Sequence, residues 1–268
     1  MSKIQPLTIA SLFCIIYFIN VTSARGGIVV VNGLTNENTV QAGSSYRGSV
    51  NLQNPGNKEQ SVRIYLKDYL YNYKGESRHD PPNSHKRSNA GWISYNPEMI
   101  TLKPGEASAV NFEVNVPAGD SLLGTYWSVL MIEEINPPDT SSNEGSITIT
   151  TSVRYAVQII TNIGNTGISD MKFADFKLEG TNGSKNLHVA VENTGERILK
   201  PQMNLELFDE SGSSTAVIKS DPRKMYPGTS IMTTLDLDGV NPGNYQGVLV
   251  VDCGEDRLFG TNLSLEIK

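Results

Sequence analysis

The chain has 268 residues, of which 38% are hydrophobic and 19% are charged, and its formal net charge at pH 7 is −6. This apolar content is too high for a disordered chain, and the length suffices for one large domain or two ordinary ones. The acidic balance and the lack of any Lys/Arg block exclude binding driven by the phosphate backbone of nucleic acid. Three His and two Cys leave little material for a metal or thiol site.

Residues 1–24 have the pattern of a secretory signal peptide. Lys3 supplies a positive charge, residues 7–21 are an uncharged apolar run, and residues 22–24 (TSA) are small. This pattern predicts export and cleavage after Ala24. The run is shorter than the about 20 residues of a bilayer span, so we expect no stable membrane span after cleavage. Cys253 is then the one remaining thiol, and its apolar surroundings predict a buried side chain.

Alternation of apolar and polar residues runs through the rest of the chain. Residues 62–66 (VRIYL) and 110–116 (VNFEVNV) are examples. Because a strand buries every second side chain, this alternation predicts antiparallel sheets with one buried face. Turn signals such as residues 103–105 (KPG) and 182–183 (NG) separate the runs, and no long helix is expected.

Three short segments recur in the same order along the chain. The pairs are residues 50–56 (VNLQNPG) with 189–195 (VAVENTG), 103–105 (KPG) with 226–228 (YPG), and 124–131 (GTYWSVLM) with 243–250 (GNYQGVLV). This repetition predicts an all-β protein of two tandem immunoglobulin-like β-sandwiches. The predicted domains are 25–166 and 167–268, and a short Gly-containing segment joins them.

Residues 74–91 (KGESRHDPPNSHKRSNAG) are a polar insertion in the first of these domains. The segment has little to bury, which predicts a long exposed loop. His79, Asp80 and His85 lie in it at irregular spacing and do not supply the fixed set of ligands that a metal site needs. Motifs of hydrolases, zinc proteases, P-loops and dinucleotide-binding loops are absent from the sequence. We therefore expect no metal, no cofactor and no enzymatic activity.

Residues 146–161 (SITITTSVRYAVQIIT) form the longest alternating run. This run has sixteen residues, whereas strands average about 5–6. It contains no Pro, and Arg154 is its only charge, so nothing in it protects an exposed edge. Two interpretations stay open. The run is either an edge strand that pairs with a partner chain, or an ordinary last strand that fills the core.

Residues 127–138 (WSVLMIEEINPP), the variable loop and long strand that follow, and the turn at 102–106 (LKPGE) resemble periplasmic pilus-assembly chaperones. In that family a basic residue on the long strand holds the C-terminal carboxylate of a pilin subunit, and the strand completes the subunit's unfinished sandwich. The resemblance implies a chaperone-like protein of the periplasm or cell envelope, with an exported, pilin-like β-rich subunit as its partner. It also implies one carboxylate anchor and a row of strand positions that bind the partner: Arg154, and Ile149, Thr151, Val153, Tyr155 and Val157.

A second resemblance concerns residues 92–97 (WISYNP), 102–106, 116–117 and 124–126. These segments are similar to surface proteins of Gram-positive bacteria that bind WxL proteins and have two immunoglobulin-like domains. This resemblance implies a surface scaffold or adhesion protein that binds cell-wall glycan or a surface protein. A glycan site requires aromatic rings exposed together, whereas core packing is the ordinary fate of large aromatics. The candidate rings are Trp92, Tyr95, Tyr69, Tyr71 and Tyr73.

Overall fold

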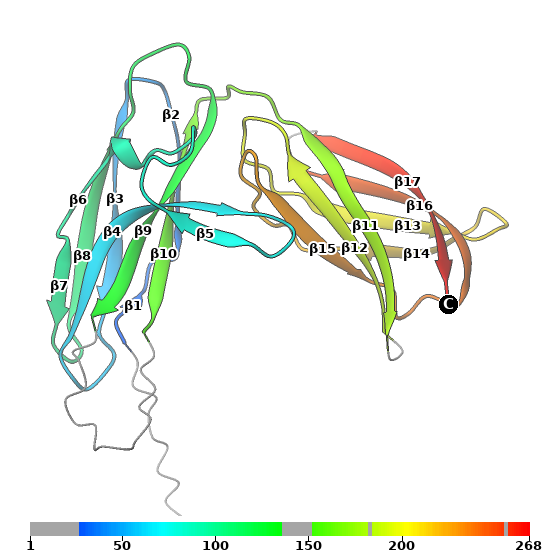
Figure 1. The fold of residues 1–268 in the computed structure, drawn as a ribbon, viewed down its shortest axis with the longest axis horizontal. Coiled ribbons are helices and arrows are strands. Elements are labelled where there is room, and N and C mark those ends of the chain that lie inside the picture. The colour runs from blue at the N-terminus through cyan, green and yellow to red at the C-terminus, as the bar shows by residue number, and fades with distance from the viewer. Residues whose placement is uncertain (1–26, 136–151, 182–183, 255–256) are drawn as a thin grey trace, which may run out of the picture.

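A computed structural model describes residues 27–135, 152–181, 184–254 and 257–268 (Figure 1). The predicted signal peptide, residues 1–24, lies outside these ranges. Strands dominate the described part of the chain, and its one helical element is a short 3-10 helix, η1 (Ala90–Trp92). Within the described residues, no helix has the length and apolar character needed to cross a membrane.

The described residues of the first sandwich form ten strands. They are β1 (Val29–Val30), β2 (Thr35–Val40), β3 (Ser45–Gln53), β4 (Gln60–Tyr71), β5 (Ser77–Asp80), β6 (Ile93–Asn96), β7 (Met99–Leu102), β8 (Ala107–Asn115), β9 (Gly124–Ile135) and β10 (Arg154–Ile163). One sheet has the order β1-β3-β8-β6, and the other has the order β2-β10-β9-β4-β5 with β7 also paired to β4. The alternation predicted for residues 110–116 is confirmed, because Val110, Phe112 and Val114 of β8 are buried between the sheets and Asn111 is exposed.

The second sandwich contains seven strands. They are β11 (Met171–Thr181), β12 (Ser184–Asn193), β13 (Gln202–Phe208), β14 (Ser214–Lys219), β15 (Ser230–Asp236), β16 (Gly243–Asp252) and β17 (Leu258–Ile267). Its sheets have the orders β11-β12-β15 and β14-β13-β16-β17, and they enclose a separate apolar core. The expected class, two tandem immunoglobulin-like β-sandwiches, is thus confirmed. The predicted boundary between residues 166 and 167 falls in the connection from β10 to β11 and stays a prediction.

The recurring segments build the same buried turn in both sandwiches. Asn54 is fully buried, donates to the carbonyls of Lys58 and Leu102, and accepts the N–H of Gly56. Asn193 makes the equivalent three bonds in the second sandwich, and its partners there are Arg197, Met225 and Gly195. The backbones of both asparagines also bond to the Pro-Gly turns at 103–105 and 226–228. The sequence repeat therefore reflects a repeated hydrogen-bond network.

The insertion at residues 74–91 is organised rather than simply exposed. Its residues 77–80 form β5, which pairs with β4 beyond the point where β4 leaves β9. The next turn is held by the fully buried carboxylate of Asp68, which accepts the N–H of Ser84 at 2.6 Å and the hydroxyl of Ser88 at 2.6 Å. Asn89 is also fully buried and donates to the carbonyl of Ile159 in β10. The prediction of a long exposed loop is right for the exposure of most of these residues but missed β5 and the buried Asn89 and Ala90, because composition gave no sign that Asp68 lies beneath them.

Aromatic contacts to Tyr226 join the two sandwiches, and one of them is the edge-on contact of Tyr71 in β4, with ring centroids 6.1 Å apart. Trp127 of β9 is 1% exposed and stacks on Tyr226, with ring centroids 4.7 Å apart and an interplanar angle of 7°. Ile160 of β10 packs in the same buried cluster. The Tyr226 hydroxyl donates to Oε1 of Gln158 at 2.6 Å, and the Trp127 indole N–H donates to the carbonyl of Tyr69 at 2.8 Å. Strands β9 and β10 are therefore fixed directly to the second sandwich.

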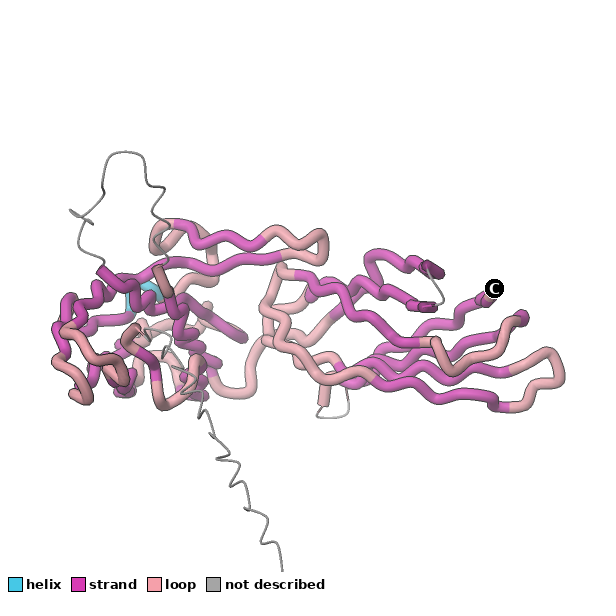
Figure 2. Tube along the Cα trace, turned by 90° about the horizontal axis from the view of Figure 1, so that it is seen from below, coloured by secondary structure: helices cyan, strands magenta, loops and turns pink. Residues whose placement is uncertain are grey.

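The β4–β5 hairpin extends from the first sandwich towards the second (Figure 1 and Figure 2). There the Tyr71 hydroxyl donates to the carbonyl of Lys224 at 2.7 Å, and the N–H of Tyr73 donates to Oγ of Ser230 at 3.0 Å. A third set of contacts centres on Glu196, whose carboxylate lies 3.1 Å from the guanidinium of Arg87. The hairpin and the insertion thus connect the two sandwiches at several points.

Asp68→Ala tests the role of the buried carboxylate. The substitution leaves buried N–H and O–H groups without an acceptor, so we expect the free energy of unfolding to fall by about 2–4 kcal/mol. Asp80→Ala on β5 removes only the partly exposed ion pair to Arg78 and should cost less than about 0.5 kcal/mol. Urea unfolding measures both, and equal losses would contradict the assignment to Asp68.

Tyr226→Ala tests the joint between the sandwiches. It removes the stacking on Trp127 and the bond to Gln158, so we expect the two sandwiches to move relative to one another while each stays folded. Small-angle X-ray scattering should then show a larger radius of gyration. Tyr245→Ala, which removes a buried tyrosine from the core of the second sandwich, is the control and should leave the scattering curve of the folded protein unchanged. An unchanged curve for Tyr226→Ala would show that other contacts hold the joint.

Candidate functional site

Strand β10 is open on one side over its first four residues. It pairs antiparallel with β9 along its whole length, from Arg154↔Glu133 to Ile163↔Gly124. On its other side β2 pairs with it in parallel, but only from Gln158↔Thr35 onwards. The preceding strand, β1, belongs to the opposite sheet and pairs with β3. Among the described residues, the outer edge of 154–157 therefore has no strand beside it.

The predicted partner-binding residues fall in different environments. Arg154 is the first residue of β10, and its side chain is 60% exposed. Val153 directly precedes the strand and is 41% exposed. Tyr155 packs partly against the core, and Val157 is 2% exposed within it, which leaves only the backbone edge of these two residues open to a partner. Ile149 and Thr151 lie outside the described residues.

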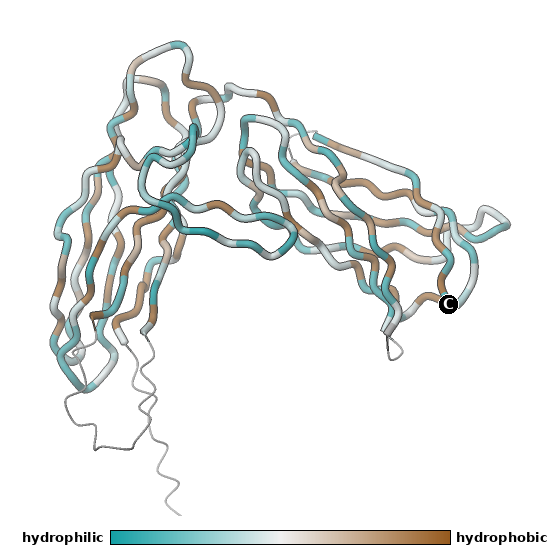
Figure 3. The backbone as a smooth tube through the Cα atoms, viewed as in Figure 1, coloured by the Kyte–Doolittle hydropathy of each residue, from teal (hydrophilic) through white to brown (hydrophobic). Residues whose placement is uncertain are grey.

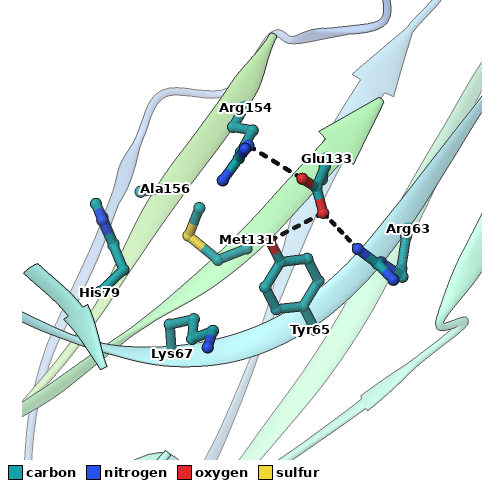
Figure 4. Close-up of a pocket in the computed structure, with 8 residues that line it drawn as sticks. All are labelled: Arg63, Tyr65, Lys67, His79, Met131, Glu133, Arg154 and Ala156. Atoms are coloured by element: carbon teal, nitrogen blue, oxygen red, sulfur yellow. Dashed lines mark hydrogen bonds and ion pairs between the residues drawn. The ribbon is translucent and has the colours of Figure 1, made fainter. Parts of the chain in front are cut away.

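The outer face of the β10-β9-β4 sheet is half covered. Where β10 approaches the second sandwich, Tyr226 covers Gln158 and Ile160. Hydrophobic residues recur along the strands of both sandwiches (Figure 3), and the buried ones form a core in each. The uncovered half of the outer face forms a hollow of about 710 Å³, here called the basic hollow (Figure 4). It is lined by residues of β4, β5, β9 and β10: Arg63, Tyr65, Lys67, His79, Met131, Glu133, Arg154 and Ala156.

Glu133 is the only carboxylate among these lining residues, and it is saturated with partners. Its Oε2 lies 2.7 Å from the guanidinium of Arg63 and 3.0 Å from the Tyr65 hydroxyl, and its Oε1 lies 3.0 Å from Nε of Arg154. The hydrogen bond from Arg63 lowers the pKa of Glu133, burial opposes this, and Tyr65 and Arg154 lower it further. Glu133 is therefore ionised at neutral pH and holds Arg154 at the start of the open edge.

At the other end of the basic hollow, positive charge is not neutralised by a bound carboxylate. The side-chain ammonium group of Lys67 makes no hydrogen bond or ion pair with any residue that the structure describes. His79 stacks on Tyr69, with ring centroids 5.1 Å apart. Burial lowers the pKa of His79, and repulsion from Arg154 and Lys67 lowers it further, whereas Asp80 acts in the opposite direction. The electrostatic potential at the imidazole is thus positive, because the nearby carboxylates do not cancel the charges of Arg154 and Lys67.

The aromatic residues that a glycan site would need do not gather on one exposed surface. Trp92 and Tyr95 pack against the core of the first sandwich, and Trp92 also contacts Tyr126. Tyr69 and Tyr71 pack around Trp127 at the joint between the sandwiches. A platform of stacked rings for sugar binding is not formed by these residues.

The described residues offer little that could serve as a metal site or a nucleophile. They contain no cluster of three or more His, Cys, Asp or Glu that could hold a metal ion. Cys253 is half-buried, and burial raises the pKa of its thiol to about 11, with Asp252 adding to this effect. Cys253 is therefore almost entirely protonated at neutral pH and a poor nucleophile.

Sequence searches find no matching family model and no matching curated protein. Solved structures align at low identity. A chain of a chaperone–tip adhesin complex of CFA/I fimbriae is 13% identical, with 89% of this chain and 98% of that chain covered and a TM-score of 0.47. A class 5 fimbriae chaperone is also 13% identical, with the same coverage and a TM-score of 0.46. A chaperone–tip adhesion subunit complex of the Csu pili of Acinetobacter baumannii is 12% identical, with 88% and 98% covered and a TM-score of 0.45.

The three solved structures are all described as fimbrial or pilus chaperones or as complexes that contain one. This is also the kind of protein that residues 127–138 resemble.

Glu133→Gln tests the ion-pair network through its pH dependence. The folded pKa of Glu133 lies below its ordinary value of 4.5, so its ion pairs stabilise the protein above that value. This contribution is lost as the pH falls through the folded pKa. We therefore expect the variant to be less stable than the parent at about pH 7 and the difference to shrink at about pH 3. Urea unfolding at both pH values measures this. A difference that is constant or grows towards low pH would contradict the network.

Proposed function

We propose that this chain is an exported, non-enzymatic, chaperone-like protein that caps an exported β-rich subunit. In this proposal, an edge strand of the subunit pairs with the open edge of β10. The observation that carries the proposal is the one-sided pairing of residues 154–157, whose outer N–H and C=O groups have no strand partner among the residues that the structure describes. Open edges of this kind add a further strand from another chain by main-chain hydrogen bonding.

The position of β2 gives the pairing a defined end. Because β2 occupies the edge from Gln158 onwards, an added strand is confined to the part of β10 before that residue. The exposed side chain of Val153 would become buried against such a strand. Main-chain hydrogen bonds contribute about 0.5–1.5 kcal/mol each, so a few of them and one apolar contact suffice for specific but reversible capping.

Arg154 is the proposed anchor for a carboxylate of the subunit. It contacts Glu133 through Nε, and its guanidinium group carries four further N–H donors. The side chain is largely exposed beside the open edge, where a carboxylate of an added strand can reach it. A bidentate bond from Arg to a carboxylate also fixes geometry, which would set the register of pairing.

Export and the class of partner rest on the sequence. The signal-peptide pattern of residues 1–24 supports secretion across the inner membrane into the periplasm or cell envelope. The resemblance of residues 127–138 supports a pilin-like or other surface subunit as the partner. Among the described residues, Trp92, Tyr95, Tyr69 and Tyr71 pack in cores or at the joint, which does not favour the alternative of glycan binding.

A photo-reactive residue at Val153, tested in the native cell envelope, identifies the partner. We expect one small exported β-rich protein to be crosslinked. Arg154→Glu should reduce this crosslink about 10–100-fold, because a charge-assisted hydrogen bond to a carboxylate is replaced by repulsion. Arg47→Glu is the matched control, since Arg47 is an exposed base on β3 of the opposite sheet and should leave the crosslink unchanged.

A second probe at Val217, which is exposed on the edge strand β14 of the second sandwich, reports non-specific contacts. If both probe positions crosslink a mixture of surface proteins, and Arg154→Glu does not change these crosslinks, the proposal is refuted and a surface scaffold is favoured. Thermal unfolding of Arg154→Glu checks that the loss is not caused by misfolding, because a largely exposed side chain should tolerate the change.

A further inference from the structure

We propose that the end of the basic hollow formed by Lys67 and His79 is a second anion subsite, which binds an Asp or Glu side chain of the segment that pairs with β10. This inference rests on the proposed function and adds the chemistry of the partner. The partner segment would be an extended strand with an acidic side chain directed onto the outer face of the sheet. The subsite lies on β4 and β5 and is distinct from Arg154, the proposed anchor at the open edge.

The first support is that two cations of the basic hollow are paired with a carboxylate, whereas the third is not. Arg63 and Arg154 are both bound to Glu133 in the free protein. Lys67 lies on the same face of β4 as Arg63 and Tyr65, and it has no acidic partner among the described residues. An ammonium group in a partly enclosed hollow gains more from a carboxylate than one in open water, because solvent screening is weaker there.

The second support is charge complementarity. The lining residues hold three permanently charged bases and one carboxylate, which gives the basic hollow a net charge of +2 with neutral histidine. The whole chain has a formal charge of −6, so this face has the opposite sign to the molecule. An acidic segment would be drawn to this face and repelled by the rest of the surface.

The third support is the shape of the basic hollow. Met131 and Ala156 give its floor an apolar part next to the open edge. His79 stands on β5, on the hairpin that extends away from the sheet towards the second sandwich (Figure 1 and Figure 4). An added strand on β10 directs every second side chain onto this outer face. Such a side chain would enter the hollow that Lys67 and His79 also line.

The charged and titratable groups around His79 decide how the subsite responds to pH. Lys67 and Tyr69 of β4 and Arg154 of β10 face it, and Asp80 is its neighbour on β5. Protonation of His79 adds a cation to the basic hollow, so the affinity for a carboxylate should rise as the pH falls from about 8 to about 5. By linkage, a bound carboxylate should raise the pKa of His79.

The test uses the full mature protein and three short synthetic peptides. The first peptide alternates valine with glutamate and is acetylated and amidated. The second has glutamine in place of glutamate, with the same blocked ends, and the third is the glutamine peptide with a free C-terminus. The readout is the pKa of His79, followed by NMR through its ring C–H signal. The chain has only three His, and His79→Gln assigns the signal.

We expect the glutamate peptide to raise the pKa of His79 and the blocked glutamine peptide to leave it unchanged. Lys67→Met should weaken binding of the glutamate peptide about three- to tenfold. It should leave binding of the glutamine peptides unaffected, which separates this subsite from strand pairing. Lys103→Met, in an exposed turn, is the matched control and should change neither.

The remaining outcomes would each refute the anion subsite, and they differ in what they imply for strand pairing. Equal binding of both blocked peptides would mean that strand pairing stands without acid recognition. A raised pKa with the free-terminus glutamine peptide alone would assign the anion to a chain terminus rather than a side chain. If no peptide moves the His79 signal while the Val153 crosslink persists in cells, the subsite is refuted and the proposed function survives. Loss of that crosslink as well would refute both.

Discussion

The stacking of Trp127 on Tyr226 divides one face of the first sandwich into two regions with different roles. The indole ring of Trp127 projects from the outer face of β9, and Tyr226 lies in the turn before β15. Their contact therefore covers the part of the sheet nearest the second sandwich. Gln158 and Ile160 of β10 are taken into this covered region. The remaining part of the face stays open, and it is there that the basic hollow and the free edge of β10 occur together.

Close approach at the joint depends on a residue without a side chain. Gly124 begins β9 with φ of +74°, and a Cβ at this position would overlap the backbone carbonyl of Glu196 in the second sandwich. The neighbouring Thr125 donates its N–H to that carbonyl at 2.8 Å. Glycine is suited to both demands, since it adopts positive φ readily and has no Cβ. The strand that carries Trp127 and Glu133 is therefore positioned from its first residue.

Two carboxylates show how burial and partners decide the role of an acidic side chain. Asp68 is fully buried, and it accepts hydrogen bonds from backbone and hydroxyl groups of the insertion. Glu133 lies in the basic hollow, and its partners are two arginines and a tyrosine. The first fixes a segment that connects the sandwiches. The second keeps two bases in place at the edge where we propose that a partner strand binds.

The sequence by itself determined the class of fold, because alternation with period two and the repeated Asn and Pro-Gly segments follow from local rules of strands and turns. It also pointed to residues 146–161 and to Arg154 as a partner-binding segment, which stays a prediction. Tertiary structure alone decided the rest. Glu133 of β9 is far along the chain from Arg63, Lys67 and His79 of the β4–β5 hairpin, and no spacing in the sequence marks them as neighbours. Likewise, the order of β2 and β10 in the sheet, which leaves residues 154–157 with one partner strand, depends on contacts between remote segments. Local patterns fix which residues face inwards, but which remote strands lie side by side depends on the packing of the whole chain.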